Sequence, residues 1–242
     1  MIIAIIMKKM VKKAGGANFT MTIEVMKMDN LAENVRTQVL DTIHKVGYDS
    51  AITLPLIEAS KCQRSPTEIG NRIIQIYGMI GLSVKNVNAG KIKSWLNSFG
   101  LFDTLGKSEK AIFDAHANSK LTEKQIMEIG WSREALFVLM WVTGVVNELP
   151  FPKKETMIEP LLSRIPPQRN TREFFSEIIC INNDLLAFQV DLHYCLHWII
   201  RNGKESSFRR EYRPSLDVVI ERRKALEWLC SSELWDEITF DT

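Results

Sequence analysis

Cysteine is scarce in this chain, and its spacing excludes a scaffold held together by disulfides. Only four cysteines occur among 242 residues, and no two of them form a C-x-x-C pair. Small secreted domains that depend on disulfides carry many more cysteines for their length. We therefore expect free thiols, mostly in apolar helical surroundings, as in a reducing compartment. They are Cys62, Cys180, Cys195 and Cys230.

A long apolar run is also missing. No stretch approaches the ~18 residues that a membrane-spanning helix needs, so we predict no membrane span. The segment 1–7 is apolar but short, and its lysines follow it. A secretory signal has its positive charges in front of the apolar segment. We therefore predict a cytoplasmic protein.

The chain has no excess of either charge. It holds 31 Lys and Arg against 29 Asp and Glu, and its 45% hydrophobic residues are typical of a globular protein. Binding to nucleic acid needs a basic surface, so we expect no nucleic-acid partner. The sequence leaves a protein partner and a small anionic ligand open.

Motifs for a cofactor, a nucleotide or a hydrolytic nucleophile are absent. The sequence has no G-x-G-x-x-G, no Walker loop, no G-x-S-x-G and no H-E-x-x-H, so we predict no cofactor. His193 and His197 are four residues apart, which places two metal ligands on one helical face. That face continues into apolar Leu186 and Val190. Hydrogen-bonded histidines are therefore the preferred interpretation, and we predict no metal site.

Helix signals dominate after residue 30, and they predict an all-α fold. Residues 65–68 and 122–125 are capping boxes, and apolar residues spaced at three and four follow them. The pattern ends one helix at Gly130 and starts the next at Ser132. The other predicted helices are 90–98, 108–117, 155–163, a long stretch from 171 to 203 with a break near 182–183, and a last helix that opens at 214–215.

The first thirty residues lack a periodic link to the rest. We predict an N-terminal extension over 1–30 and one helical domain over 31–242. Segment 1–20 fits either a weak amphipathic helix or an upstream tail with a second start at Met21, and the tail is preferred. Segment 20–28 alternates weakly in hydropathy, which allows one short strand there.

Four segments resemble one bacterial family. Residues 191–201 read D-x-x-Y-x-L-H-W-x-x-R, and residues 221–229 read E-R-x-x-A-L-x-W-L before Trp235-Asp236. Residues 129–141 resemble a W-R-x-E-A-L…L-x-W segment with Ser132 inserted, and Arg64, Glu68 and Arg72 resemble its N-terminal part. The chain thus resembles domain of unknown function 4272 over roughly residues 34–242. The resemblance implies a helical, cytosolic bacterial protein and no particular activity.

Polar residues of these segments form the candidate site, and two interpretations stay open. In one, arginines hold an anionic group in a cleft while His197 moves a proton, with Glu221 as a second catalytic candidate. In the other, which we prefer, the charges form an ion-pair network that locks the C-terminal helices together. The candidate binding residues are Asp191, Trp198, Arg201, Arg222, Trp228 and Asp236, and the wider set adds Trp131, Arg133 and Glu134.

Arg222 separates the two interpretations. It shares a helical stripe with apolar residues, so its head should be buried against a carboxylate. Asp191 and Asp236 are the leading candidates, with Glu134 and Glu221 behind them. The preferred function is a binding or interaction module without catalysis. The alternative is an enzyme that acts on a small anionic substrate.

Overall fold

Helices make up all the regular structure of the described residues. The computed structural model describes residues 16–57, 61–84 and 87–240, and it describes side chains from residue 31 onward. No strand occurs within these ranges, and the all-α prediction is confirmed. No helix there combines the length and the apolar character needed to cross a membrane.

The elements follow one another in the order of their labels. The α-helices are α2 (Gly16–Lys45), α3 (Pro66–Gly81), α4 (Ala89–Ser98), α5 (Lys107–Ala117), α6 (Glu123–Val142), α7 (Thr171–Ser176), α8 (Asn183–Arg201) and α9 (Leu216–Cys230). The 3-10 turns are η1 (Glu159–Arg164), η2 (Glu205–Ser207), η3 (Arg210–Tyr212) and η4 (Trp235–Glu237).

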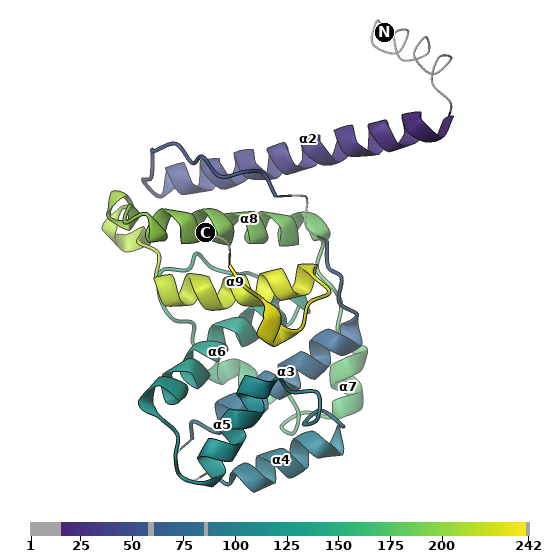
Figure 1. The fold of residues 1–242 in the computed structure, drawn as a ribbon, viewed down its shortest axis with the longest axis vertical. Coiled ribbons are helices and arrows are strands. Elements are labelled where there is room, and N and C mark those ends of the chain that lie inside the picture. The colour runs from purple at the N-terminus through teal and green to yellow at the C-terminus, as the bar shows by residue number, and fades with distance from the viewer. Residues whose placement is uncertain (1–15, 58–60, 85–86, 241–242) are drawn as a thin grey trace, which may run out of the picture.

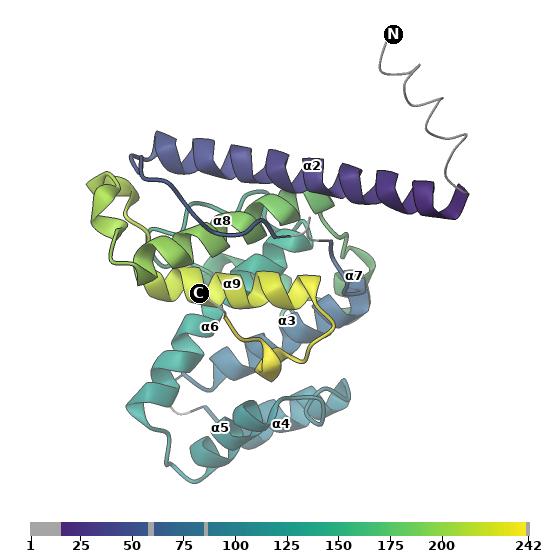
Figure 2. The same cartoon turned by 45° about the horizontal axis from the view of Figure 1, so that its top comes forward.

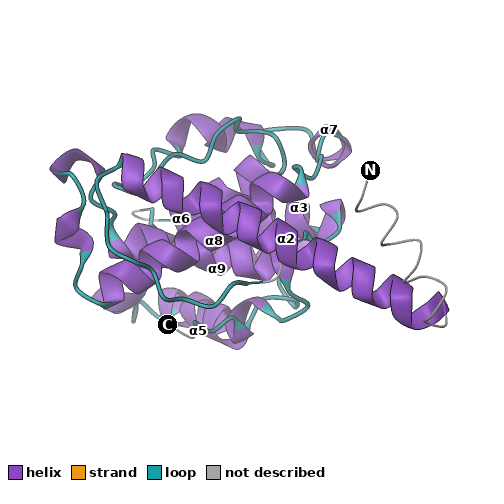
Figure 3. Ribbon diagram, turned by 90° about the horizontal axis from the view of Figure 1, so that it is seen from above, coloured by secondary structure: helices purple, strands orange, loops and turns teal. Residues whose placement is uncertain are grey.

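The helices stack in layers along the longest axis. Figure 1 shows α2 beside α8, α8 beside α9, and α9 beside α6, with α4 and α5 at the far end. The same order holds in the tilted view of Figure 2. Seen from above in Figure 3, α2 crosses the stack, and its N-terminal end projects beyond the other helices.

Two apolar clusters hold these layers together. The larger one joins α3, α6 and α9 through side chains such as Ile73, Leu139 and Leu226, each fully buried. The smaller one joins α2, α8 and α9 around Val39 and Leu196. The C-terminal tail runs from α9 along the surface towards α5 (Figure 1), which places η4 beside the N-terminal end of α5.

Helix starts agree with the sequence where a capping residue is present. Ser65 Oγ accepts from Glu68 N at 3.2 Å, and Glu68 Oε2 accepts from Ser65 N at 2.8 Å. Thr122 and Gln125 form the same reciprocal pair at the start of α6. The predicted break near 182–183 is also present, since Asn182 caps α8.

Two local predictions are wrong. Helix α6 continues through Gly130, and Ser132 caps nothing, because its hydroxyl donates to the carbonyl of Ile129 at 2.6 Å inside the helix. A glycine costs a helix only about 1 kcal/mol, and the buried face from Ile129 onward outweighs that. The strand allowed at 20–28 lies inside α2.

The predicted extension over 1–30 falls partly outside the described residues. Residues 1–15, with most of the segment that fits either a surface helix or a tail, are not described. The backbone of α2 runs without interruption across residue 30. The division into 1–30 and 31–242 stays a prediction.

Candidate functional site

The predicted polar residues occupy separate places in the fold. Asp191, His197, Arg222 and Asp236 each have different partners, from different helices. The single cleft of the enzymatic interpretation is therefore not formed by this set. What each residue contacts decides which of them can take part in a site.

Arg222 is sealed between α9 and α6. Its side chain has 0% exposure, and its Nε donates to Glu134 Oε2 at 2.8 Å. Its Nη2 donates to Thr156 Oγ1 at 2.8 Å, and its Nη1 donates to the carbonyl of Pro150. All three nitrogens of the head have acceptors inside the protein, and the side chain is fully buried, so Arg222 is not accessible to a ligand.

The expected burial of Arg222 and its pairing across helices are thus confirmed, but the leading partners are wrong. Glu134 takes the place expected for Asp191 or Asp236, because α6 packs directly on the α9 stripe that carries Arg222. Burial lowers the pKa of the Arg222 guanidinium, and the Glu134 carboxylate opposes that effect.

Asp191 is bound by a residue that the sequence did not single out. Arg36 of α2 donates from Nε to Asp191 Oδ2 and from Nη2 to Asp191 Oδ1, both at 2.8 Å. The same guanidinium donates to the carbonyls of Leu54 and Pro55 at 3.0 and 3.1 Å. The pair fastens α2 and the segment 46–57 onto α8. The sequence did contain a sign of this pair, because Arg36 lies among the apolar residues that α2 buries.

His197 lies beneath the C-terminal tail. It is 4% exposed, its Nδ1 lies 2.6 Å from Arg223 Nη1, and its ring meets the Phe240 ring edge-on at 5.6 Å. Burial, Arg223 and Arg201 lower its pKa to about 4. A neutral imidazole whose Nδ1 accepts from an arginine is therefore the form present at neutral pH.

His193 faces a different environment from His197. It is 0% exposed, and its Nδ1 donates to the carbonyl of Gln189 at 2.8 Å. Burial and the charge of Arg222 lower its pKa to about 3. Among the described residues, no three His, Cys, Asp or Glu side chains come together as a metal site requires.

The remaining candidates divide between the surface and the interior. Arg201 is exposed, and Arg133 pairs at the surface with a glutamate of η1. Trp198 is half-buried, with a lysine ammonium 5.0 Å from its ring centroid. Trp228 is buried and packs edge-on against Trp235 with ring centroids 5.6 Å apart. None of these residues shares a hydrogen bond with another.

A cavity of about 270 Å³ lies between α3, α5, α6, α9 and the C-terminal tail. Two of the predicted residues, Glu221 and Asp236, line it. Its other polar walls were not predicted as site residues. They are Arg72, Ser108, Glu109, Glu128, Ser132 and Lys224, with Trp235, Ile76, Met79, Ile112 and Ile129 as the apolar part.

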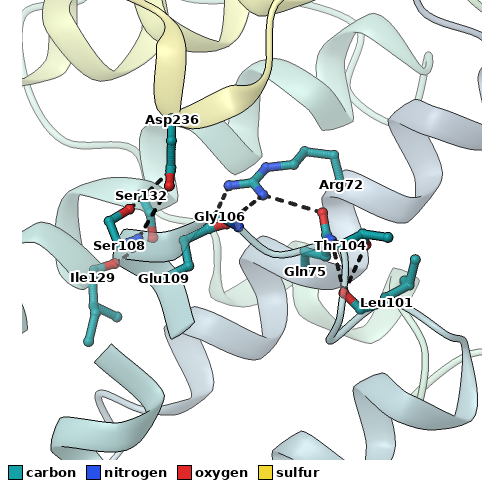
Figure 4. Close-up of polar contacts among 10 residues, drawn as sticks. All are labelled: Arg72, Gln75, Leu101, Thr104, Gly106, Ser108, Glu109, Ile129, Ser132 and Asp236. Carbon is teal, nitrogen blue, oxygen red and sulfur yellow. Dashed lines mark hydrogen bonds and ion pairs between the residues drawn. The ribbon is translucent and has the colours of Figure 1, made fainter. Parts of the chain in front are cut away.

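One wall is a closed ion pair, drawn in Figure 4. Arg72 Nη1 donates to Glu109 Oε2 at 3.1 Å, and Arg72 Nη2 donates to Glu109 Oε1. The Trp235 ring covers the guanidinium at 4.0 Å. Burial acts to raise the pKa of Glu109, but Arg72 outweighs it and the pKa lies below its usual range. These two charges satisfy each other.

Asp236 anchors the tail onto the start of α5. Its Oδ1 accepts from Ser108 Oγ at 3.0 Å and its Oδ2 from Ser108 N at 3.3 Å, as Figure 4 shows. A Cβ at Gly106 would lie only 2.0 Å from Asp236 Oδ2. The carboxylate therefore stabilises a helix N-terminus, and glycine at 106 leaves room for it.

Glu221 is the exception in this cavity. It makes no hydrogen bond or ion pair within the ranges that the structure describes. Burial raises the pKa of its carboxyl, Glu128 and Asp217 raise it further, and Lys224 only partly opposes them. Lys224 lies over the Trp235 ring, 5.2 Å from its centroid. Glu221 therefore presents a half-buried carboxyl to the cavity, without a protein partner among the described residues.

Comparison with known protein families identifies the family of this chain. The family model described as Domain of unknown function (DUF4272) matches residues 35–238. The chain belongs to this family. No curated protein and no solved structure matched it.

Several residues that carry the resemblance to the family line the cavity. Arg72 comes from the N-terminal part of the resemblance, whereas Glu221 and Trp235-Asp236 come from its C-terminal part, and the fold brings them to one cavity. The sequence analysis placed Glu221 and Asp236 in one network with His197 and Arg222, and it assigned neither Arg72 nor Trp235 to the candidate site. Lys224 and Glu128 gave no signal, since helical charges usually face solvent.

Proposed function

We propose that this DUF4272 protein is a binding module without catalysis, and that the cavity between α3, α5, α6, α9 and the tail is its ligand site. The observation that carries the proposal is the carboxyl of Glu221, which faces the cavity without a partner. Partial burial disfavours the ionised form of such a carboxyl, and no described side chain donates to it in compensation. Proteins retain such a group where a ligand completes it.

The side chains around the cavity favour binding over chemistry. Both serine hydroxyls already donate, Ser108 to Asp236 and Ser132 to the carbonyl of Ile129. No histidine lines the cavity among the described residues, so neither hydroxyl has the base that a serine nucleophile needs. His197 is engaged elsewhere, with Arg223 and Phe240.

A second candidate function is an enzyme that acts on a small anionic substrate. The raised pKa of Glu221 favours it, because a carboxyl that holds its proton more tightly than usual is the kind of group that serves as a general acid. The buried Nε of Arg72 has no acceptor among the described residues, and Lys224 supplies a second cation. The enzymatic interpretation of the sequence had His197 as the acid and Arg201 and Arg222 as the groups that hold the anion. The cavity would instead use Glu221 as the acid, and Arg72 and Lys224 would hold the anion.

We further propose that the protein is a bacterial cytoplasmic protein and that it does not bind nucleic acid. The described cysteines are free thiols, which suits a reducing compartment. The near-neutral charge offers no basic surface for phosphates. A protein partner at the same cavity is disfavoured because the cavity is small.

Fragment mapping tests the proposal. A ¹⁵N-labelled full chain would be titrated with a mixed library of small amines, carboxylates, alcohols and sugars. We expect chemical-shift changes to gather at the residues that line the cavity, and to weaken in Glu221→Gln but not in the exposed control Glu148→Gln. Shifts that gather instead at the apolar groove of Tyr77, Ile92 and Trp95 would refute the site. Turnover of a carboxylate fragment would favour the enzyme.

A further inference from the structure

One buried donor in the wall of the cavity has no acceptor inside the protein. Arg72 is 4% exposed, and its Nε is buried without a hydrogen-bond partner among the described residues. We infer, building on the proposed function, that the ligand is a small uncharged amide whose carbonyl oxygen accepts a hydrogen bond from Arg72 Nε. The step beyond the binding proposal is the chemical class of the ligand.

The other two nitrogens of the Arg72 guanidinium are engaged. Nη1 donates to Glu109 Oε2 at 3.1 Å and to Gln75 Oε1 at 3.3 Å, and Nη2 donates to Glu109 Oε1. Figure 4 shows Nε on the edge of the guanidinium that is turned away from Glu109. The Trp235 ring lies over the guanidinium at 4.0 Å, so we expect this ring to shift when an acceptor reaches Nε. Nε is therefore the nitrogen of Arg72 that remains for a ligand.

A second arginine–tryptophan stack nearby shows a satisfied Nε. Arg64 lies over the Trp228 ring, 4.6 Å from its centroid, as Arg72 lies over Trp235. The Nε of Arg64 donates to the carbonyl of Trp228 at 3.0 Å. A buried donor of a charged group that lacks an acceptor loses its hydrogen bonds to water without replacement, which destabilises the fold. A carbonyl oxygen from outside the chain would supply at Arg72 what Trp228 supplies at Arg64.

The charges around the cavity are balanced, which favours a ligand without net charge. The counter-charges are Glu109 for Arg72, Lys124 for Glu128, Lys224 for Glu221, and the N-terminal dipole of α5 for Asp236. A charged ligand would give up its hydration in a cavity that holds no unmatched opposite charge. An uncharged ligand avoids that cost.

An amide fits the polar and the apolar walls together. Its carbonyl accepts from Arg72 Nε, and its N–H can donate to the half-buried carboxyl of Glu221, which accepts from no described side chain. A short alkyl chain can lie against Ile76, Met79 and Ile112. The volume of about 270 Å³ lies just below the range of roughly 300–1,000 Å³ typical of sites for drug-sized ligands. The ligand is therefore a small molecule.

The experiment compares three probes of similar shape on the full chain: butyramide, butyrate and n-butylammonium. The chain is labelled with ¹⁵N in its backbone and in its arginine side chains. We expect butyramide to move the Nε–Hε signal of Arg72 downfield and to slow its exchange with water, because Hε gains an acceptor. The indole signal of Trp235 should move with it. The two charged probes should bind about tenfold more weakly, since the cavity does not balance their charge.

Other arginines of the chain serve as internal controls. Their Nε atoms already have acceptors inside the protein, so their Nε–Hε signals should not respond to butyramide. They are Arg36, which donates to Asp191, Arg64, which donates to the Trp228 carbonyl, and Arg222, which donates to Glu134.

A pair of matched variants isolates Nε. Arg72→Lys keeps a cation beside Glu109 but has no Nε, and it should weaken butyramide binding about tenfold, as the loss of one hydrogen bond to a charged group predicts. Arg64→Lys makes the same change at the other stack and should leave the affinity unchanged. If Arg72→Lys folds poorly, the Arg72 signal of the parent protein decides alone.

Three results would overturn the inference and leave the proposed site open. Tighter binding of butyrate than of butyramide, with shifts at the cavity residues, would make the ligand an anion and favour the enzyme. Shifts of the cavity residues by butyramide without a response of Arg72 Hε would show that Nε does not recognise the ligand. No shift at all by millimolar butyramide would refute the amide class, and the fragment map then decides separately whether the cavity binds anything.

A fourth result would overturn the inference together with the proposed site. Arg72 also borders a second cavity, of about 400 Å³, which Asn71 and Thr104 line. If Arg72 Hε responds while the shifts gather at Asn71 and Thr104 instead of Ile129 and Glu221, the acceptor enters from that second cavity. Shifts at Ile129 and Glu221 together with the Arg72 response support both proposals.

Discussion

Glu221 and Arg222 are neighbours on α9, yet Arg222 is fully buried and paired while Glu221 is half-buried and lines a cavity. Arg222 faces α6, where Glu134, Thr156 and Pro150 accept from all three of its nitrogens. Glu221 faces the cavity, where no described side chain donates to it. Successive helix residues point about 100° apart, so a single step along the chain separates a sealed ion pair from an open carboxyl.

The comparison shows that burial of a charge is by itself no sign of function. A buried charge that pairs with an opposite charge inside the protein serves the fold, and the pairs Arg36–Asp191 and Arg222–Glu134 both fit that description. A carboxyl that lines a cavity without a protein partner is instead a candidate for ligand binding. Variants on the two sides of α9 test this difference, from the largest expected effect to the smallest.

Removing Arg222 should have the largest effect. Arg222→Ala leaves Glu134 buried without a partner and opens a cavity, and we expect a loss on the order of 3 kcal/mol in the free energy of unfolding. Urea unfolding at neutral pH measures it. Arg222→Met keeps the shape of the side chain, and it should cost clearly less than Arg222→Ala because it opens no cavity.

An unchanged midpoint for Arg222→Ala would contradict the structural role of the pair. It would return Arg222 to the list of ligand-binding candidates, and the enzymatic interpretation would gain from it. The matched control is Arg133→Ala, which removes an exposed arginine from a surface pair and should cost below about 1 kcal/mol.

Acid should lower the free energy of unfolding through His193, which is fully buried on α8. Its folded pKa is about 3, whereas an unfolded histidine titrates near its ordinary value of 6.5. A depressed folded pKa means that the unfolded state binds the proton first, so stability is lost as pH falls below about 6.5. The loss is roughly 1.4 kcal/mol per pH unit for one such group.

His197, with a pKa of about 4, adds to this slope over a narrower window. The variant His193→Asn keeps a donor for the carbonyl of Gln189 and removes one titration. Its unfolding free energy should therefore depend less steeply on pH between 6.5 and 4. An identical slope for both proteins would show that His193 is not held neutral by the fold.

Breaking the cap on α5 should cost less. Asp236→Ala removes the acceptor of the Ser108 amide and hydroxyl, and we expect a loss of about 1 kcal/mol, as for other helix N-caps. Thermal unfolding gives its size, and hydrogen exchange should show faster exchange at the start of α5. Gly106→Ala should have a similar effect, since its Cβ would displace the same carboxylate. Unchanged exchange in both variants would contradict the anchoring role of the tail.

The sequence predicted what is local and missed what depends on packing between distant segments. The capping boxes at Ser65 and Thr122 need only neighbouring residues, and both are present. Gly130 is a local signal too, but the buried face of α6 overrides it. Arg36 and Arg72 escaped notice as site residues because their partners lie 155 and 37 residues away.

The candidate site shows the same limit. Glu221 and Asp236 were named from the resemblance, but the network proposed for them joined residues that the fold keeps apart. Periodicity gives the face of a helix that is buried. It does not say whether a charge on the neighbouring face meets a partner or a cavity. That distinction needed the position of α5 and of the C-terminal tail.

The smallest expected effect has the opposite sign, and it tests the cavity directly. The folded pKa of Glu221 lies above its unfolded value, so the folded state holds its proton longer as pH rises. Stability contributed by this group is therefore lost between the ordinary pKa of a glutamate and the raised one. Glu221→Gln removes the titration and should stabilise the ligand-free protein slightly at neutral pH, by less than Asp236→Ala destabilises it.

Urea unfolding of Glu221→Gln across the pH range measures this gain against the control Glu148→Gln. The gain should vanish in acid, where the carboxyl of the parent protein is protonated in both states. A loss of stability as large as that of Arg222→Ala would mean that Glu221 has a partner which stabilises its charge, as Glu134 does for Arg222. The two neighbours on α9 would then both be structural, and the cavity would lose its claim to a ligand. A gain at neutral pH would place the instability of the ligand-free protein at the Glu221 carboxyl, as expected for a group without a protein partner.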